Sequence, residues 1–148
     1  MKKMRQGFTL AELIVFVVIV GILAAIAIPK FRDLMGRSYD GATKGSLSTV
    51  RSAIQVYYGD NRGWFPADKL ECLTLNAKYL NEIPMAKMKG TGHAVSSAVA
   101  VAFKDGPGWF YDDGSASTAA WGSFMVNCTH VDEAGRKRGS TGMIWSSF

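Results

Sequence analysis

The stretch RQGFTLAELIVFVVIVGILAAIAIPKF, residues 5–31 of the 148, decides the fold class of this chain. From Phe8 to Ile28 it is apolar or small apart from Thr9 and Glu12, and Pro29 ends the run. An α-helix of this length rises about 31 Å, which matches the roughly 30 Å hydrocarbon core of a bilayer. The stretch therefore predicts a membrane-spanning helix.

Basic residues precede this helix, and the remainder of the chain is closer to neutral. Lys2, Lys3 and Arg5 place the N-terminus in the cytoplasm by the positive-inside rule, and everything after Pro29 outside it. These residues also supply three of the five net positive charges, so that two remain in a chain without residues 1–7. The overall charge is therefore weak support for nucleic-acid binding.

Glu12 is the one acid in the span, and three interpretations treat it differently. A cleaved secretory signal would use Ala25-Ile26-Ala27 as its cleavage site, and an ordinary anchor would leave Glu12 near the headgroups. A charge deep in a bilayer costs roughly 2.5–3.5 kcal/mol and usually has a partner. Cutting between Gly7 and Phe8 would create an ammonium group on Phe8. On a neighbouring copy of the chain this group could neutralise Glu12, and the acid would then set the register of a homopolymer.

The motif GFTLAEL at residues 7–13 follows a basic leader and precedes the apolar run GILAAIAIP at residues 21–29. This arrangement resembles the class III signal of type IV pilins and type II secretion pseudopilins. The resemblance covers residues 1–30 closely and residues 31–60 loosely. One departure is Ala11, where members of the family often carry a larger hydrophobic residue.

This resemblance implies a role for several residues of the segment. A prepilin peptidase would cut after Gly7, where the missing side chain lets the enzyme approach the backbone, and would methylate the new amine of Phe8. Glu12 would contact that amine on an adjacent subunit. Gly21 and Pro29 would bracket a weakened helical segment that can unwind when subunits pack in a filament.

The same resemblance implies a function and a location. The chain would be a structural subunit of a type IV pilus-like filament, a homopolymer assembled by an inner-membrane platform and an ATPase. It would be stored in the inner membrane and reach the cell surface or periplasm as a filament, and we expect no enzymatic activity. Two alternatives stay open. One is the major pseudopilin of a type II secretion system, and the other is an exported or anchored binding module.

Beyond Pro29 the helix is expected to continue to about Tyr58. Apolar residues recur at helical spacing over residues 46–58, whereas Gly36, Gly41 and Gly45 weaken the middle. The turn residues of GDNRGWFP at 59–66 end the helix, and residues 70–84 predict a short helix or turns. The expected domains are a leader at 1–7, a transmembrane and polymerisation helix at 8–29, and a periplasmic or extracellular head at 30–148.

Strand patterns dominate the rest of the chain, at residues 93–103, 108–113, 121–128 and 142–148. The predicted fold class is therefore α+β, with a long helix whose second half packs on a small antiparallel sheet. A disulfide between Cys72 and Cys128 would staple this head by closing a loop of about 55 residues, worth roughly 4 kcal/mol in the chain-entropy model. The alternative is two buried thiols.

The sequence shows no pattern typical of a catalytic site. His93 and His130 lack a visible nucleophile, and the wide spacing of the two cysteines and two histidines argues against a structural zinc site. Asp112 and Asp113 are weak calcium candidates without the spacing of an EF-hand loop, so a solvated hairpin turn and no cofactor are expected.

A short basic run is the remaining candidate for a nucleic-acid contact. Arg136, Lys137 and Arg138 lie between glycines in GRKRGS, residues 135–140. Three charges in this setting usually form a solvated loop, although DNA remains an open partner.

Overall fold

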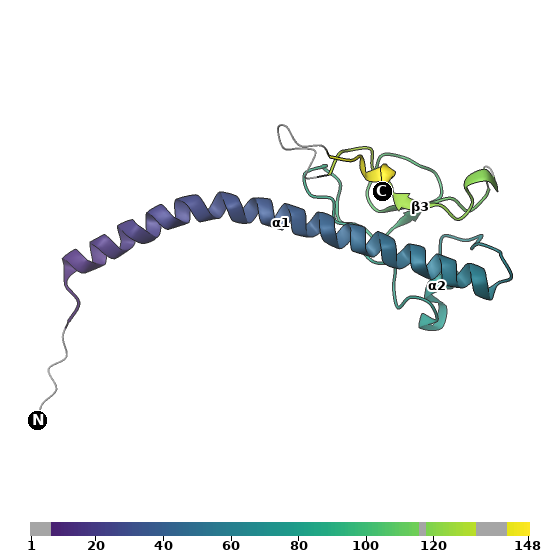
Figure 1. The fold of residues 1–148 in the computed structure, drawn as a ribbon, viewed down its shortest axis with the longest axis horizontal. Helices are drawn as coiled ribbons and strands as arrows, with labels where there is room; N and C mark the ends of the chain where they lie inside the picture. Colours follow the sequence, from purple (N-terminus) through teal and green to yellow (C-terminus); the bar gives the residue numbers. More distant parts are fainter. Residues whose placement is uncertain (1–6, 116–117, 133–141) are drawn as a thin grey trace, which may run out of the picture. The chain divides into compact units, whose positions relative to one another are not determined.

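The computed structural model describes residues 7–115, 118–132 and 142–148, which form two compact units, Met1–Met35 and Gly36–Phe148. Residues 1–6 of the predicted leader and the basic run at Arg136, Lys137 and Arg138 lie outside the described residues. The elements appear in Figure 1: α1 (Leu10–Asp60), α2 (Glu71–Thr74), η1 (Leu75–Ala77), β1 (Val99–Ala100), β2 (Trp109–Tyr111), η2 (Thr118–Ala120), β3 (Phe124–Val126) and η3 (Trp145–Ser147), where η denotes a 3-10 helix.

Helix α1 is a single element of 51 residues, which confirms the predicted long helix. It includes the glycine-containing stretch 36–45, where helix propensity alone is poor. From this stretch onward, buried residues of α1 follow one another at mostly three- and four-residue intervals: Gly36, Asp40, Thr43, Leu47, Val50, Ala53 and Ile54. One face of the helix is therefore held by packing, which stabilises helices in proteins more than propensity does.

The core of the unit Gly36–Phe148 lies between this face of α1 and the sheet. Leu47, Val50 and Ile54 belong to one cluster with buried side chains of β2 and β3, including Trp109 and Phe124. The rings of Trp109 and Phe124 lie 5.0 Å apart between centroids. In Figure 1 the short strands and loops lie beside the C-terminal half of α1, which confirms the predicted α+β architecture.

The sheet is mixed rather than wholly antiparallel. Its order is β1-β2-β3, with β2 antiparallel to β3 but parallel to β1. The parallel pairing depends on Gly108, whose φ of +89° belongs to the left-handed region that favours glycine. The chain there brings the N–H of Trp109 to the carbonyl of Ala98, 2.9 Å from donor to acceptor. A strand pattern predicts the strand, but it does not predict the direction in which the strand pairs.

The predicted strands are also shorter than their patterns. In the stretch 142–148, Ile144 forms an isolated bridge with Val131, and η3 follows it. In this segment the N–H of Ser146 bonds to the carbonyl of Cys128 at 3.0 Å, so the end of the described chain lies against the residues that follow β3.

Two proline carbonyls anchor the large aromatic side chains of the head. The Tyr111 hydroxyl donates to Pro66 O at 2.6 Å, and the Trp109 indole N–H donates to Pro84 O at 2.7 Å. Proline lacks an N–H, but its carbonyl remains an acceptor. In the turn 59–66, Phe65 packs on Tyr58, whereas Trp64 is largely exposed and pairs with Trp121 in a T-shaped arrangement.

The structure does not join Cys72 to Cys128, contrary to the predicted disulfide. Cys72 lies in α2, where its N–H and its thiol bond to the Asp68 carboxylate at 2.9 and 3.3 Å. Cys128 follows β3 with its Sγ 3.4 Å from Nδ1 of His130. The disulfide is therefore not shown, and it stays a prediction, because the entropy of loop closure gives the value of a cross-link without indicating which side chains meet.

Candidate functional site

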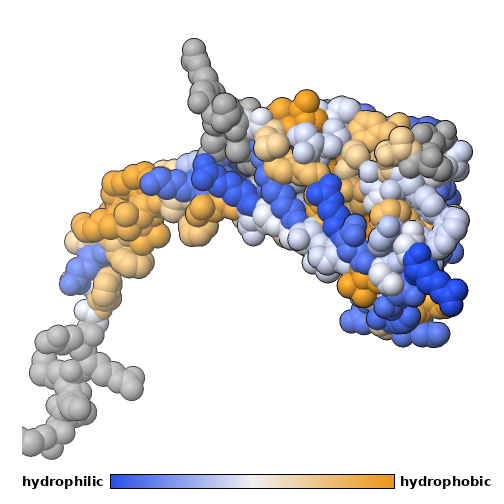
Figure 2. All heavy atoms as spheres, turned by 45° about the vertical axis from the view of Figure 1, so that its right-hand side comes forward, coloured by the Kyte–Doolittle hydropathy of each residue, from blue (hydrophilic) through white to orange (hydrophobic). Residues whose placement is uncertain are grey.

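The N-terminal part of α1 exposes a large apolar surface. None of residues 7–35 is buried within the chain, and the apolar side chains of α1 appear in Figure 2 as an orange surface with hydrophilic atoms in blue at both ends. Among the described residues, α1 is the one helix whose length and composition suffice to cross a membrane. An exposed apolar surface of this extent is typical of a segment that contacts a membrane or another protein.

Glu12 and Thr9 cap the start of this helix. The N–H and the hydroxyl of Thr9 both donate to Oε2 of Glu12, at 2.9 and 2.7 Å, and the N–H of Glu12 lies 3.2 Å from the Thr9 hydroxyl oxygen. This reciprocal pattern is a capping box, in which a threonine and a glutamate three residues later satisfy each other's backbone N–H groups. This role of Thr9 was not predicted, although the T-x-x-E spacing before an apolar run is its known signal.

A shallow apolar groove adjoins the carboxylate. Its lining residues all come from the first turns of the helix and its approach: Phe8, Ala11, Glu12, Val15, Phe16 and Ile19. The helix therefore presents one acid within an otherwise apolar surface. A second apolar segment that brings a positive charge would match this surface in shape and in charge.

The glycines of the segment are not required by the chain's own packing. A Cβ atom on Gly7 or on Gly21 would have no neighbour within 4 Å. The reason for glycine at position 7 therefore lies outside the folded chain. Helix α1 includes both Gly21 and Pro29. The predicted unwinding between them stays a prediction about the filament.

Asp112 and Asp113 form local turns. Oδ1 of Asp112 accepts the N–H of Gly114 at 2.9 Å, and Oδ1 of Asp113 accepts the N–H of Ser115 at 3.0 Å. Each carboxylate thus accepts a backbone N–H two residues further on, which is the geometry of an Asx turn.

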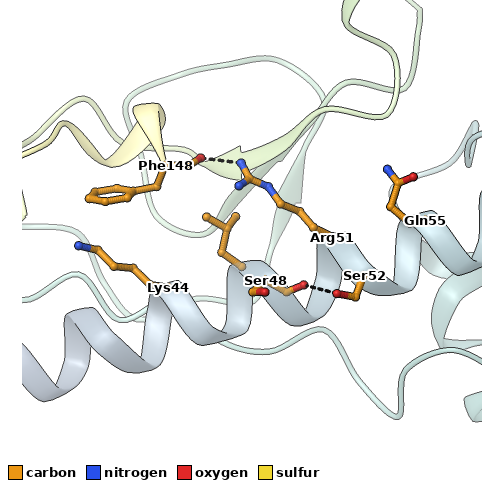
Figure 3. Close-up of a pocket in the computed structure, with 7 residues that line it drawn as sticks. Lys44, Ser48, Arg51, Ser52, Gln55 and Phe148 are labelled. Atoms are coloured by element: carbon orange, nitrogen blue, oxygen red, sulfur yellow. Dashed lines mark hydrogen bonds between the residues drawn. The ribbon is translucent and has the colours of Figure 1, made fainter.

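A second groove lies along the C-terminal half of α1, where Figure 3 shows its lining residues. Its two cations have partners: Lys44 pairs with Asp132 at 2.9 Å, and Arg51 donates to the carbonyls of Phe124 and Phe148. Its lining residues are Lys44, Leu47, Ser48, Arg51, Ser52, Gln55 and Phe148, and they include no acid, histidine or cysteine. These side chains fasten the helix to β3 and to the end of the chain.

Four side chains with metal-binding atoms meet in the head, although they are far apart in the sequence. His93, Asp105, Cys128 and His130 each place one ligand atom so that all four atoms lie within 4.8 Å of one another. The N–H of Thr129 bonds to Oδ1 of Asp105 at 2.9 Å and is the main cause that lowers the pKa of this carboxyl. Cys72, which the sequence analysis also considered as a zinc ligand, does not belong to this group. The sequence contains no motif that would have indicated Asp105.

The N-terminal segment matches a known family model. This model, described as the prokaryotic N-terminal methylation motif, matches residues 2–28. This range contains Gly7, Phe8, Thr9 and Glu12, and it ends one residue before Pro29. No solved structure matches the chain significantly.

Several curated proteins are similar over a longer stretch. Fimbrial protein EcpC of Eikenella corrodens is 36% identical over 107 residues, which cover 64% of this chain and 69% of EcpC. Type IV major fimbrial protein FimA of Dichelobacter nodosus is 36% identical over 78 residues, 48% of this chain and 50% of FimA. Type IV major pilin protein PilE of Neisseria gonorrhoeae is 33% identical over 88 residues, 56% of this chain and 52% of PilE. The motif, the capped apolar helix, the α+β head and these relatives together show that the chain belongs to the type IV pilin family.

Proposed function

We propose that this chain is the structural subunit of a type IV pilus filament, cleaved after Gly7 and polymerised through the apolar part of α1. The observation that carries the proposal is the exposed apolar helix that begins with a single capped acid inside the matched methylation motif. Membership of the pilin family supports a filament subunit, and no chemistry of a catalytic site is needed to explain the segment.

The role proposed for Glu12 follows from electrostatics in an apolar bundle. Cleavage after Gly7 leaves an ammonium on Phe8, and methylation of that amine keeps its charge. When helices pack side by side, Glu12 of one subunit and the amine of its neighbour lie in low dielectric, where an unpaired charge is very costly. The pair then selects one axial stagger between subunits.

The capping box supplies a partner for Glu12 before assembly. The bonds from Thr9 satisfy the carboxylate in the single chain, and the positive end of the helix dipole favours an acid in the first turn. The stored subunit in the inner membrane therefore holds Glu12 at the helix start with its charge compensated in part. Assembly by an inner-membrane platform and an ATPase would then add the ammonium of the neighbour.

The alternatives differ in what remains of the N-terminus and in where the filament is found. The named relatives are fimbrial proteins and pilins, which favours a pilus over a secretion pseudopilus. A binding module that uses residues 1–28 only for export or tethering would have no need of the Glu12 pair.

Mass spectrometry of the mature chain tests the proposal. We expect N-methylated Phe8 as the first residue, in chains from both the membrane and sheared surface fibres. Ile28 as the first residue would indicate a cleaved secretory signal and overturn the proposal, and so would a chain that keeps residues 1–7. Gly7→Leu should block cleavage, whereas Gly21→Ala, at a glycine with equally open surroundings, should leave cleavage intact.

A further inference from the structure

The four residues His93, Asp105, Cys128 and His130 come from three segments that the fold fastens together. Asp105 and Cys128 are linked through their neighbours: the N–H of Lys104 bonds to Oδ1 of Asn127 at 2.9 Å, and the N–H of Gly106 bonds to the Asn127 carbonyl at 2.7 Å. The N–H of Thr129 bonds to Asp105 itself. The backbone therefore positions two of the four side chains before any ligand is considered.

The segment of His130 is held equally firmly. The N–H of Trp145 bonds to the His130 carbonyl at 2.9 Å, and the N–H of Ser146 bonds to the Cys128 carbonyl at 3.0 Å. His93 is fixed at its own backbone, where its N–H bonds to the Thr91 hydroxyl at 3.3 Å. The four side chains thus project from an arrangement that hydrogen bonds hold in place.

The distances among the ligand atoms fit a tetrahedral metal ion. Nε2 of His93 lies 3.3 Å from Oδ1 of Asp105, and Nδ1 of His130 lies 3.5 Å from the same oxygen. The Cys128 sulfur lies 3.4 Å from Nδ1 of His130. A zinc ion with bonds of 2.0–2.3 Å has ligands about 3.3–3.8 Å apart. Three of the six distances already have this length, and all six lie within 4.8 Å.

We propose that His93, Asp105, Cys128 and His130 form a binding site for a divalent transition metal, with Zn²⁺ as the ion that the ligands suit best. Imidazole nitrogen and thiolate sulfur are preferred zinc ligands, and one carboxylate oxygen completes a four-coordinate set. Calcium is a poor match because it takes six to eight oxygen ligands. On binding, the Cys128 thiol loses its proton to solvent and its sulfur coordinates the ion as thiolate.

Burial and the surrounding hydrogen bonds support this assignment. Cys128 is fully buried, whereas the side chains of Asp105 and His130 are 39% and 46% exposed, which leaves an entry path for the ion. The N–H of His130 points to the Cys128 sulfur at 3.4 Å, and the N–H of Thr129 bonds to Asp105. Such outer bonds orient metal ligands and stabilise their charged forms.

The site would supply the cross-link that the small head otherwise lacks. The described part of the head contains only two- and three-residue strands and very short helices apart from α1, and the predicted disulfide is not formed. A metal bound here would join residues 93, 105 and 128–130. It would also make a bond between Cys72 and Cys128 incompatible with the site.

The test uses the full chain in detergent micelles, purified without a histidine tag, stripped with a chelator and kept reduced by a phosphine. Co²⁺ serves as the spectroscopic probe and Zn²⁺ as the competitor. We expect one Co²⁺ per chain, intense tetrahedral d–d bands and a thiolate-to-cobalt charge-transfer band. Zn²⁺ should displace the cobalt, and Ca²⁺ should not. Excess Zn²⁺ at a hundredfold over Kd should raise the thermal midpoint by about 5 °C or more.

Variants assign the ligands. His130→Ala and Asp105→Asn should each weaken Zn²⁺ binding at least tenfold, and Cys128→Ser should remove the charge-transfer band. Cys72→Ser is the matched control and should keep both the band and the stoichiometry. Because Cys128 is buried and its replacement could prevent folding, the exposed His130 and Asp105 variants, checked by circular dichroism, carry the test independently.

Three results would overturn the proposal. The first is an octahedral cobalt spectrum without a thiolate band in the native chain. The second is Zn²⁺ affinity that is unchanged in the folded His130 and Asp105 variants, or lowered equally by Cys72→Ser. The third is a Cys72–Cys128 bond found by peptide mapping of freshly isolated, non-reduced chain, since that bond would remove the sulfur ligand.

Discussion

The backbone of Gly108 packs directly against the carbonyl group of Ala98. A Cβ atom built on Gly108 would lie 2.4 Å from the Ala98 oxygen, closer than real contacts allow. The same turn delivers the N–H of Trp109 to that oxygen, which begins the parallel pairing of β1 and β2. The sheet therefore depends on a side chain being absent at this position.

Gly108→Ala should destabilise the head through both this clash and the positive φ. Strain at a positive φ costs about 1–3 kcal/mol, and the clash with the backbone adds to it. Gly92→Ala is the control, because Gly92 has a φ of +81° but a Cβ atom there would have no neighbour within 4 Å. Thermal unfolding of the full chain should show the larger loss for Gly108→Ala, and equal losses would contradict the packing argument.

Thr43→Val should lower the free energy of unfolding by about 1–3 kcal/mol, the cost of leaving buried polar groups unsatisfied. The buried Thr43 hydroxyl donates to the Lys87 carbonyl at 3.0 Å and accepts the Lys87 N–H at 2.9 Å. Thr49→Val is the matched control on the same helix, because the exposed Thr49 hydroxyl bonds only to the Gly45 carbonyl at 3.0 Å. We expect the control to change stability by less than about 0.5 kcal/mol in denaturant unfolding.

Thr9→Val should loosen the first turn of α1. The change removes the hydroxyl bonds to Glu12 and keeps the shape of the side chain, at a cost of about 1 kcal/mol for a lost cap. Hydrogen exchange of the N–H groups in residues 10–13, measured in micelles, should become faster. Thr9→Ser keeps a hydroxyl and should restore slow exchange. Unchanged exchange in Thr9→Val would show that the cap does not stabilise the helix.

Glu12→Ala and Glu12→Val should leave membrane insertion intact and abolish or shorten filaments. An apolar replacement suits lipid, but it leaves the ammonium of the neighbouring Phe8 without its partner. Carbonate extraction measures insertion, and electron microscopy of sheared fibres measures assembly. Fibres of normal length and number from both variants would refute the register role of the carboxylate.

Cys72 should react slowly with alkylating reagents at neutral pH. Burial, together with the Asp68 carboxylate, raises the pKa of the Cys72 thiol to about 11. The reactive form is the thiolate, so labelling followed by mass spectrometry should accelerate as the pH approaches that value. Asp68→Asn should move the acceleration to lower pH. A labelling rate equal to that of the unfolded chain at pH 8 would contradict the raised pKa.

The same pKa shift has a consequence for stability. The folded chain favours the neutral form of the Cys72 thiol. The stabilisation that this preference adds to the free energy of unfolding is fully present below the ordinary thiol pKa, and it declines as the pH rises from there to about 11. Cys72→Ala should remove this part of the alkaline loss. The difference between the unfolding curves of the two chains across this pH range measures it.

Features that depend on neighbouring residues were predictable. The apolar run and its termination pattern involve residues within a turn or two, and α1 follows from them. The T-x-x-E cap is equally local and could have been predicted, although it was not. The stripe of residues 47, 50 and 54 likewise predicts the face that packs on the sheet. Family membership rests largely on the same local segment, since the methylation motif ends at residue 28.

The sequence by itself determined the apolar helix, its capped acid and the α+β class, because periodicity and capping act over short separations along the chain. Only the tertiary structure decided the direction of β1, the separate surroundings of Cys72 and Cys128, and the meeting of His93, Asp105 and His130. Those features depend on the paths of the loops that connect the short elements of the head. Loop paths follow no periodic pattern of side chains, so these contacts cannot be predicted from the sequence and are defined only by the packing of the whole head.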